Sequence, residues 1–365
     1  MHSVNHGPKL ERLVRLEDSK SGLSGYIAIH STAYGPAAGG CRFKHYETDA
    51  EAEADAARLA EGMSYKNVMA GLPLGGGKAV IRLPDRPFDR DQLFRAFGQA
   101  VERLGGEYIT AEDFGTSMDD MASVAKATRH VAGLPVKDGK PGGDPSHWTA
   151  LGVKVAMEQA AQVRFGKPLS ELTVAVQGLG HVGFELCRLL HQAGAKLIIA
   201  EPRAELAARA AVEFDAQVSN CRNLLTAKAD IFAPCALGGV LTRDAALHMR
   251  AKLVCGAANN QLASSEVGTL LAGRGILYAP DYVVNAGGII NVAAEYLGHS
   301  SAEVKHRVEA TGERLMEVLN FADRASIPTN RAADTLARDA ITAARLAQTD
   351  KAPANTVQPA LAIPA

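Results

Sequence analysis

The stretch Val174-Ala175-Val176-Gln177-Gly178-Leu179-Gly180-His181-Val182-Gly183 leads an apolar, β-branched run into the spacing G-x-G-x-x-G, and an apolar helical pattern follows it. In a strand, turn and helix of this kind, the first glycine makes the turn, the second lets the backbone approach a pyrophosphate, and the third lets helix and strand pack closely. The helix N-terminus adds N–H donors and a positive dipole end. The stretch therefore predicts a dinucleotide site over Gly178, Leu179, Gly180, His181, Val182 and Gly183.

The next apolar run, 195–200, ends at Glu201, 18 residues after Gly183. An acidic side chain at this place accepts hydrogen bonds from an adenosine ribose and repels a 2′-phosphate. We therefore expect NAD rather than NADP as the cofactor, with Arg203 softening that preference.

Further short apolar runs (231–233, 252–255 and 276–279) are separated by helical stretches, which predicts a doubly wound parallel sheet. Ahead of it, 25–30 reads as a strand, a capping box at Thr48 opens a helix to Met63 with Lys66 directly after it, and 93–104 has helical spacing. The fold class is thus α/β, with an N-terminal α/β substrate domain, a Rossmann dinucleotide-binding domain and the active site in the cleft between them.

The predicted boundaries follow a glycine- and proline-rich stretch, 133–145, which we interpret as the connection between the domains. They are a substrate domain over 1–135, completed by C-terminal helices at about 323–349, and an NAD-binding domain over 146–322. Two long helices are expected at 301–322 and 332–347. The proline- and alanine-rich tail, 350–365, is expected to be disordered.

Composition narrows the function classes. The 365 residues are 47% hydrophobic with a formal net charge of −1, and they contain no basic run, secretory leader or long apolar span. We expect a cytoplasmic protein that binds neither nucleic acid nor membrane. The 5 cysteines are scattered without C-x-x-C spacing and the 11 histidines show no ligand pattern, so no metal is expected.

Two lysines stand out upstream of the dinucleotide motif: Lys66 in Met63-Ser64-Tyr65-Lys66-Asn67, and Lys78 after Gly75-Gly76-Gly77. Lys78 precedes a buried-type strand, and glycines let another body approach the backbone. We therefore place Lys78, partly desolvated, at a strand entrance. Burial and a nearby Lys66 would both lower the pKa of Lys78 toward a catalytic range.

Seven stretches in this order resemble signatures of the amino-acid dehydrogenase family of glutamate, leucine, phenylalanine and valine dehydrogenases, with the leucine and phenylalanine members nearest. They are 35–42, 63–67, 72–78, 110–116, 233–239, 256–262 and 278–288. The resemblance runs from about Gly25 to Ala347.

The resemblance implies a homo-oligomer that catalyses reversible, NAD-dependent deamination of an L-amino acid to a 2-oxo acid and ammonia. By resemblance, Lys66 binds the substrate carboxylate, Lys78 activates the attacking water, and Asp113 exchanges protons at the amino group. A carboxylate needs a fixed cation, and imine hydrolysis needs a base near neutrality. The remaining carried-over contacts are Gly39, Gly40 and Asn259 for substrate, and Thr149, Ala236, Leu237, Ala257, Ala258 and again Asn259 for cofactor.

The expected substrate is apolar. Glutamate-specific members carry a lysine where this chain has Ala38, and burying a side-chain carboxylate without a partner is costly. A small residue such as Ala38 at this position is similar to what phenylalanine-specific members have. The bulky Ile289 and Val292 are instead similar to the pocket residues of leucine and valine dehydrogenases. Leucine, valine, isoleucine and phenylalanine all remain candidates.

Two alternatives belong to other classes. A noncatalytic NAD- or amino-acid-sensing protein on the same scaffold would keep the glycine turn but lose Lys66, Lys78 or Asp113, and all three are present. A 2-hydroxy-acid dehydrogenase would need a histidine–arginine pairing that we do not find in a recognisable place. The role of Trp148 is open.

Overall fold

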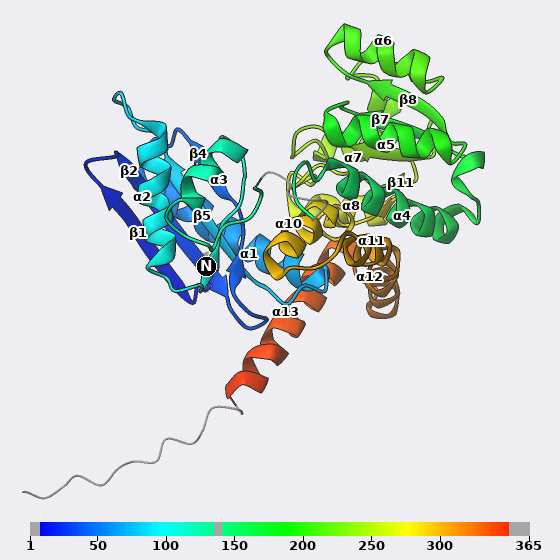
Figure 1. Ribbon diagram of the computed structural model, residues 1–365. Helices are drawn as coiled ribbons and strands as arrows, with labels where there is room; N and C mark the ends of the chain where they lie inside the picture. The colour runs from blue at the N-terminus through cyan, green and yellow to red at the C-terminus, as the bar shows by residue number, and fades with distance from the viewer. Residues whose placement is uncertain (1–7, 135–140, 350–365) are drawn as a thin grey trace, which may run out of the picture.

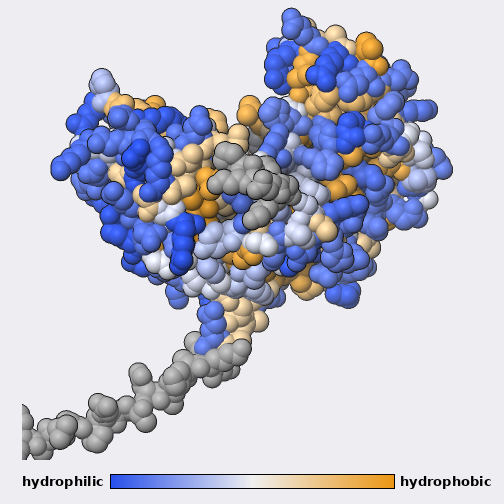
Figure 2. Space-filling view, in the orientation of Figure 1, coloured by the Kyte–Doolittle hydropathy of each residue, from blue (hydrophilic) through white to orange (hydrophobic). Residues whose placement is uncertain are grey.

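The computed structural model describes residues 8–134 and 141–349 and has two lobes (Figure 1). We call residues 8–134 the N-terminal lobe and residues 141–325 the C-terminal lobe. A notch separates them on the face shown in Figure 2. None of the helices in the described ranges combines the length and hydropathy needed to cross a membrane.

The N-terminal lobe is built on a mixed sheet with the order β1-β2-β5-β3-β6, in which β4 also pairs with β5. β1 and β2 are antiparallel, as are β2 and β5, whereas β3 and β4 run parallel to β5. Its strands are β1 (Arg12–Asp18), β2 (Leu23–Ser31), β3 (Ala37–Ala38), β4 (Cys41–Lys44), β5 (Gly75–Arg82) and β6 (Tyr108–Ile109).

Helices cover both faces of this sheet. Alternate residues of β5 point to opposite faces, so Val80 packs with the alanines of α1 (Asp49–Met69) while Ile81 packs with α2 (Arg90–Glu102) and α3 (Met118–Ala125). The even-numbered positions of β5, including Lys78, therefore face α1.

The C-terminal lobe has a parallel sheet of order β12-β11-β10-β7-β8-β9. Renumbered from β7, this is the Rossmann order with its reversal between β7 and β10, where ligands bind at the carboxyl ends of the strands. The strands are β7 (Thr173–Gln177), β8 (Lys196–Ala200), β9 (Gln217–Val218), β10 (Ile231–Pro234), β11 (Leu253–Val254) and β12 (Leu277–Tyr278). The predicted Rossmann fold is confirmed.

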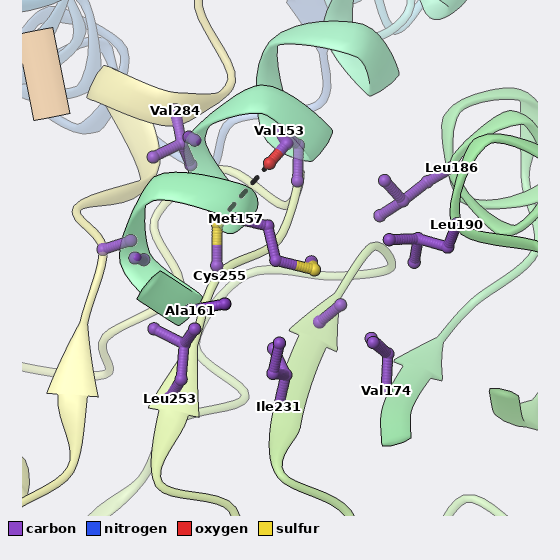
Figure 3. Packing of buried hydrophobic residues seen from close by; sticks show 14 of the residues in the cluster. Val153, Met157, Ala161, Val174, Leu186, Leu190, Ile231, Leu253, Cys255 and Val284 are labelled. Atoms are coloured by element: carbon purple, nitrogen blue, oxygen red, sulfur yellow. Dashed lines mark hydrogen bonds between the residues drawn. The ribbon is translucent and has the colours of Figure 1, made fainter. Parts of the chain in front are cut away.

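Each face of the parallel sheet is covered by helices. α4 (Ser146–Phe165) and α5 (His181–Gln192) cover one face, and Figure 3 shows Met157 and Leu186 over Val174 and Ile231. The other face is covered by α7 and α8. The remaining helices of the C-terminal lobe are α6 (Ala204–Glu213), α7 (Arg243–His248), α8 (Ser265–Gly273), α9 (Asp281–Val284), α10 (Gly287–Leu297), α11 (Ser301–Glu309) and α12 (Thr311–Ala325). The helix α13 (Thr329–Thr349) follows this lobe.

Four sequence expectations about the helices and strands were wrong in detail. The helix from Thr48 does not end at Met63 but continues through Gly62 to Met69, and Gly71, with φ +66°, follows its C-cap. Lys66 therefore lies within α1. Lys78 is not at a strand entrance, since β5 begins at Gly75.

The helix expected over 301–322 is two helices, α11 and α12, which meet at Ala310. A Cβ on Gly312 would lie 2.8 Å from Cγ of Gln159 on α4, so close packing on α4 accompanies the new helix direction. The helix predicted at 332–347 is confirmed as α13. Residues 135–140, within the predicted connection, and the predicted tail 350–365 lie outside the described residues.

Candidate active site

The triple glycine of β5 brings α1 directly onto the sheet. A Cβ on Gly76 would lie 2.0 Å from the backbone N of Ser64, and one on Gly77 would lie 2.8 Å from the Tyr108 ring. These glycines are thus approached by other parts of the same chain, not by a ligand. Because α1 lies so close, Lys66 from the helix and Lys78 from the strand are brought to one side of the sheet.

Lys78 is buried, with 5% of its surface exposed, and its Nζ lies 3.0 Å from Oδ2 of Asp113. Asp113 is held in its loop by Thr116, whose hydroxyl accepts the Asp113 backbone N–H at 2.9 Å. The two residues expected to exchange protons therefore form one ion pair.

Burial is the largest influence on both pKa values of this pair. It lowers the pKa of Lys78, against the opposing charge of Asp113, and the guanidinium of Arg42 lowers it further. Burial alone would raise the pKa of Asp113, but the charges of Lys78 and Arg42 outweigh it and the net shift is downward. The expected repulsion between Lys66 and Lys78 is present, and Arg42 is a further cation that lowers the pKa of Lys78.

Arg42 was missed as a site residue, although it lies within the stretch 35–42 that carried the resemblance. β4 runs beside β5 and places Arg42 Nε 2.9 Å from Oδ2 of Asp113. Its Nη1 lies 3.3 Å from Asp55, which also accepts the hydroxyl of Tyr46 at 2.7 Å. Arg42 therefore joins Asp113 to a second carboxylate and favours the ionised form of Asp113.

Lys66 lies between the lobes. Its Nζ donates to Oδ1 of Asn259 at 3.5 Å, and the Nδ2 of Asn285 donates to that same oxygen at 2.9 Å. Burial lowers the pKa of Lys66 to about 8, with the charge of Asp281 opposing the shift and that of Lys78 adding to it. Asn285, which the sequence did not single out, orients the predicted substrate contact Asn259.

A small, narrow apolar pocket lies near this ion-pair cluster, since its lining residue Gly39 packs against Gly77, the neighbour of Lys78. Ala38, Gly39, Ile289 and Val292, four of the predicted substrate contacts, all line it. Its other lining residues are Leu74, Ile109, Thr110, Ala111, Ala132, Ala293 and Tyr296. Gly40 instead packs against the loop that carries Asp113, since a Cβ there would lie 2.3 Å from the carbonyl O of Glu112.

The predicted dinucleotide turn has one open glycine between two packed ones. Gly178 has φ +89° and touches Ala236, and a Cβ on Gly183 would lie 2.0 Å from the Gly178 carbonyl O. A Cβ on Gly180 would meet no atom within 4 Å. Space at the second glycine, with the N-terminus of α5 directly after it, fits a bound pyrophosphate. A pocket of about 560 Å³ beside the turn is lined by Leu179, Gly180 and His181 among others.

Glu201 lies at the end of β8 and contacts the turn. Its carboxylate accepts the Leu179 backbone N–H at 2.8 Å and the Nε of Arg203 at 2.6 Å. The hydrogen bond from Arg203 is the largest cause that lowers the pKa of Glu201, to about 2. The carboxylate is therefore ionised at neutral pH, and its charge is shared with Arg203.

The other predicted cofactor residues lie around the carboxyl ends of the strands. Ala236 and the exposed Leu237 follow β10, and Ala257 and Ala258 follow β11. Thr149 is in the first turn of α4, 2.9 Å from where a Cβ on Gly288 would stand. Val182 lies in the first turn of α5, and the exposed His181 lies 3.3 Å from Asp144. Within 8–134 and 141–349, no cluster of three histidine, cysteine or acidic side chains could hold a metal.

Comparisons with known proteins agree with this geometry. Residues 11–130 match the family described as Glu/Leu/Phe/Val dehydrogenase, dimerisation domain, and residues 199–349 match Glutamate/Leucine/Phenylalanine/Valine dehydrogenase. The chain is 45% identical to a leucine dehydrogenase of Thermoactinomyces intermedius, with 91% of this chain and 90% of that one covered. It is 43% identical to a valine dehydrogenase of Streptomyces coelicolor, with 94% and 96% covered.

A solved structure, that of L-tryptophan dehydrogenase from Nostoc punctiforme, superposes with a TM-score of 0.83 at 36% identity and covers 92% of this chain and 97% of its own. The predicted family resemblance is confirmed. The chain belongs to the Glu/Leu/Phe/Val dehydrogenase family and is an amino-acid dehydrogenase.

Proposed function

We propose that this dehydrogenase acts on branched aliphatic L-amino acids, with leucine, valine and isoleucine as substrates, and uses NAD to convert them reversibly to the 2-oxo acid and ammonia. The observation that carries the proposal is the apolar pocket beside the Lys78–Asp113 pair. None of the described residues that line this pocket is charged, so a glutamate side chain would lose its hydration without gaining a partner. The leucine and valine dehydrogenases among its relatives support the same substrates.

The proposed roles follow from the charges. Lys66, held toward Asn259, binds the substrate carboxylate as an ammonium. Burial lowers the pKa of Lys78, which favours its unprotonated form, the form that can take a proton from the attacking water. Asp113, kept ionised by Arg42, accepts a proton from the substrate amino group and returns it to the leaving ammonia. NAD, when bound at the turn of Gly178, Gly180 and Gly183, supplies the hydride acceptor.

The preference for NAD over NADP rests on Glu201. A carboxylate at the end of β8 can accept hydrogen bonds from the ribose hydroxyls and repels a 2′-phosphate. Arg203 is bound to that carboxylate rather than being directed away from it, which weakens the repulsion. We expect a measurable but secondary use of NADP.

Two further proposals concern assembly and location. The match of residues 11–130 to a dimerisation domain supports a homo-oligomer. We also propose that the enzyme acts in the cytoplasm.

The test is NADH formation from a panel of L-amino acids, with NAD and then NADP. Leucine, valine and isoleucine should give the highest kcat/KM with NAD, phenylalanine less, and glutamate at most a trace. Equal turnover of glutamate and leucine would contradict the proposed pocket. Silence across the panel, together with intact NADH binding, would instead favour a noncatalytic sensor, for which the comparisons offer no support.

A further inference from the structure

One face of α10 forms a long wall of the apolar pocket. Ile289, Val292, Ala293 and Tyr296 all line the pocket, and their spacing of three, four and seven residues puts them on one side of the helix. Ile289 and Tyr296 are seven residues apart, which is about 10 Å along a helix. The wall therefore has two distinct ends.

The first end of α10 lies on the cofactor side. A Cβ on Gly287 would lie 2.0 Å from the carbonyl O of Trp148, and one on Gly288 would lie 2.9 Å from the hydroxyl of Thr149, so this end is against the first turn of α4. Trp148 itself packs into the same apolar cluster as Ile289 and Tyr296. A substrate whose reacting carbon faces the cofactor thus extends its side chain along α10 toward Tyr296.

Tyr296 is fixed from the opposite lobe. Its hydroxyl lies 3.0 Å from Nδ1 of His130. His130 is 5% exposed, its carbonyl accepts the Thr110 backbone N–H at 3.1 Å, and Thr110 also lines the pocket. A Cβ on Gly106 would lie 2.9 Å from the His130 ring, so the imidazole has little room to move. The ring of Tyr296 is therefore held in place across the boundary between the lobes.

We propose that Tyr296, anchored by His130, is a specificity-determining residue that closes the far end of the side-chain pocket and excludes aromatic amino acids. The inference rests on the proposed function and extends it. Ala38 is a small lining residue, and its small size was interpreted from the sequence as a feature shared with phenylalanine-specific members. Tyr296 is the last lining residue along α10, so its ring limits how far a side chain can extend along that helix.

The experiment compares kcat/KM for leucine and phenylalanine in the wild type, Tyr296→Ala and Tyr296→Phe. Tyr296→Ala should raise the phenylalanine-to-leucine ratio by about tenfold or more, the scale of discrimination that a change of this size produces in an apolar pocket. Tyr296→Phe keeps the ring but loses the bond to His130, and should raise the ratio by a smaller factor. Tyr34→Phe is the matched control, because the Tyr34 hydroxyl contacts the carbonyl O of Ala340 instead and is not among the pocket-lining residues.

NADH binding and thermal unfolding are measured for each variant. If Tyr296→Ala does not fold, Tyr296→Leu keeps an apolar side chain there and should show the same direction of change. An unchanged ratio in folded variants, with the wild type active on leucine, overturns this inference alone. A wild type that deaminates no amino acid overturns the proposed function and this inference with it.

Discussion

Two glycine-rich segments lie on either side of this active site, and they serve opposite purposes. In β5, added Cβ atoms at Gly75, Gly76 and Gly77 would all collide with neighbouring parts of the same chain. In the turn after β7, a Cβ on Gly180 would meet nothing. All three glycines of β5 face space that the protein itself fills, whereas in the turn the central glycine, Gly180, faces space that the protein leaves open.

This difference explains how a lysine becomes a candidate base. Close packing of α1 on β5 excludes water from Lys78, and that burial is the largest cause of its lowered pKa. The open turn, by contrast, keeps backbone N–H groups available at the start of α5. A glycine motif read from sequence alone does not say which of these two situations applies.

The largest expected effect follows from replacing the group that the packed segment buries. Lys78→Ala should lower kcat for leucine deamination by about 1,000-fold, within the range of general acid–base contributions, while NADH binding stays unchanged. Lys305→Ala is the control, since its ammonium lies 3.8 Å from Glu309 on an exposed helix face. Substantial residual turnover in Lys78→Ala would exclude this residue as the base.

Gly76→Ala tests the packed segment directly. The new methyl group would collide with the backbone of α1, so we expect the free energy of unfolding to fall by about 3 kcal/mol. Gly62→Ala, on the same helix and with no atom within 4 Å of the added Cβ, should be neutral or slightly stabilising. Chemical denaturation of both variants measures the difference, and equal stabilities would contradict the packing argument.

Gly180→Ala tests the open turn. Stability should change by less than about 0.5 kcal/mol, as for other substitutions into open space, while the NADH dissociation constant should rise by about tenfold or more because a methyl group would crowd the pyrophosphate. Gly273→Ala in α8, whose Cβ also meets nothing, should leave NADH binding as it is. Loss of stability without loss of NADH binding would reverse the assignment of the two segments.

The last prediction concerns Lys66 and pH. Because burial lowers its pKa to about 8, its ammonium is present below pH 8 and is lost as the pH rises above it. Binding of a branched 2-oxo acid to the enzyme–NADH complex should weaken by about tenfold per pH unit above that value. Calorimetry of the wild type and Lys66→Gln checks this: the variant should bind weakly at every pH, and a flat wild-type profile to pH 9.5 would contradict the proposed role.

Local patterns in the sequence predicted much of the fold. The strand–turn–helix at Gly178 and the doubly wound parallel sheet around it were foreseeable because the motif and the apolar runs are short-range signals. The end of α1 was not, because the helix continues through Gly62 while its second half packs on β5. The break at Ala310 was not either, because packing between distant helices accompanies it.

The candidate site divides in the same way. Ala38, Ile289 and Val292 were predicted as pocket residues from resemblance, and the structure brings them together. Arg42 and the Tyr296–His130 pair were not predicted. Their importance lies in contacts between residues that are 71 and 166 positions apart, and no single stretch of sequence carries that information.

The last described helix has a consequence for how this protein is made. α13 packs against α1, and Arg345 near its end contacts Glu11 and the carbonyl O of His30 in the first sheet. The N-terminal lobe leaves the ribosome first, yet these contacts form only after residue 345 has been synthesised. The sheet of the N-terminal lobe therefore lacks its contacts with α13 until nearly the whole chain has been synthesised. The last step in folding of this lobe thus depends on the end of translation.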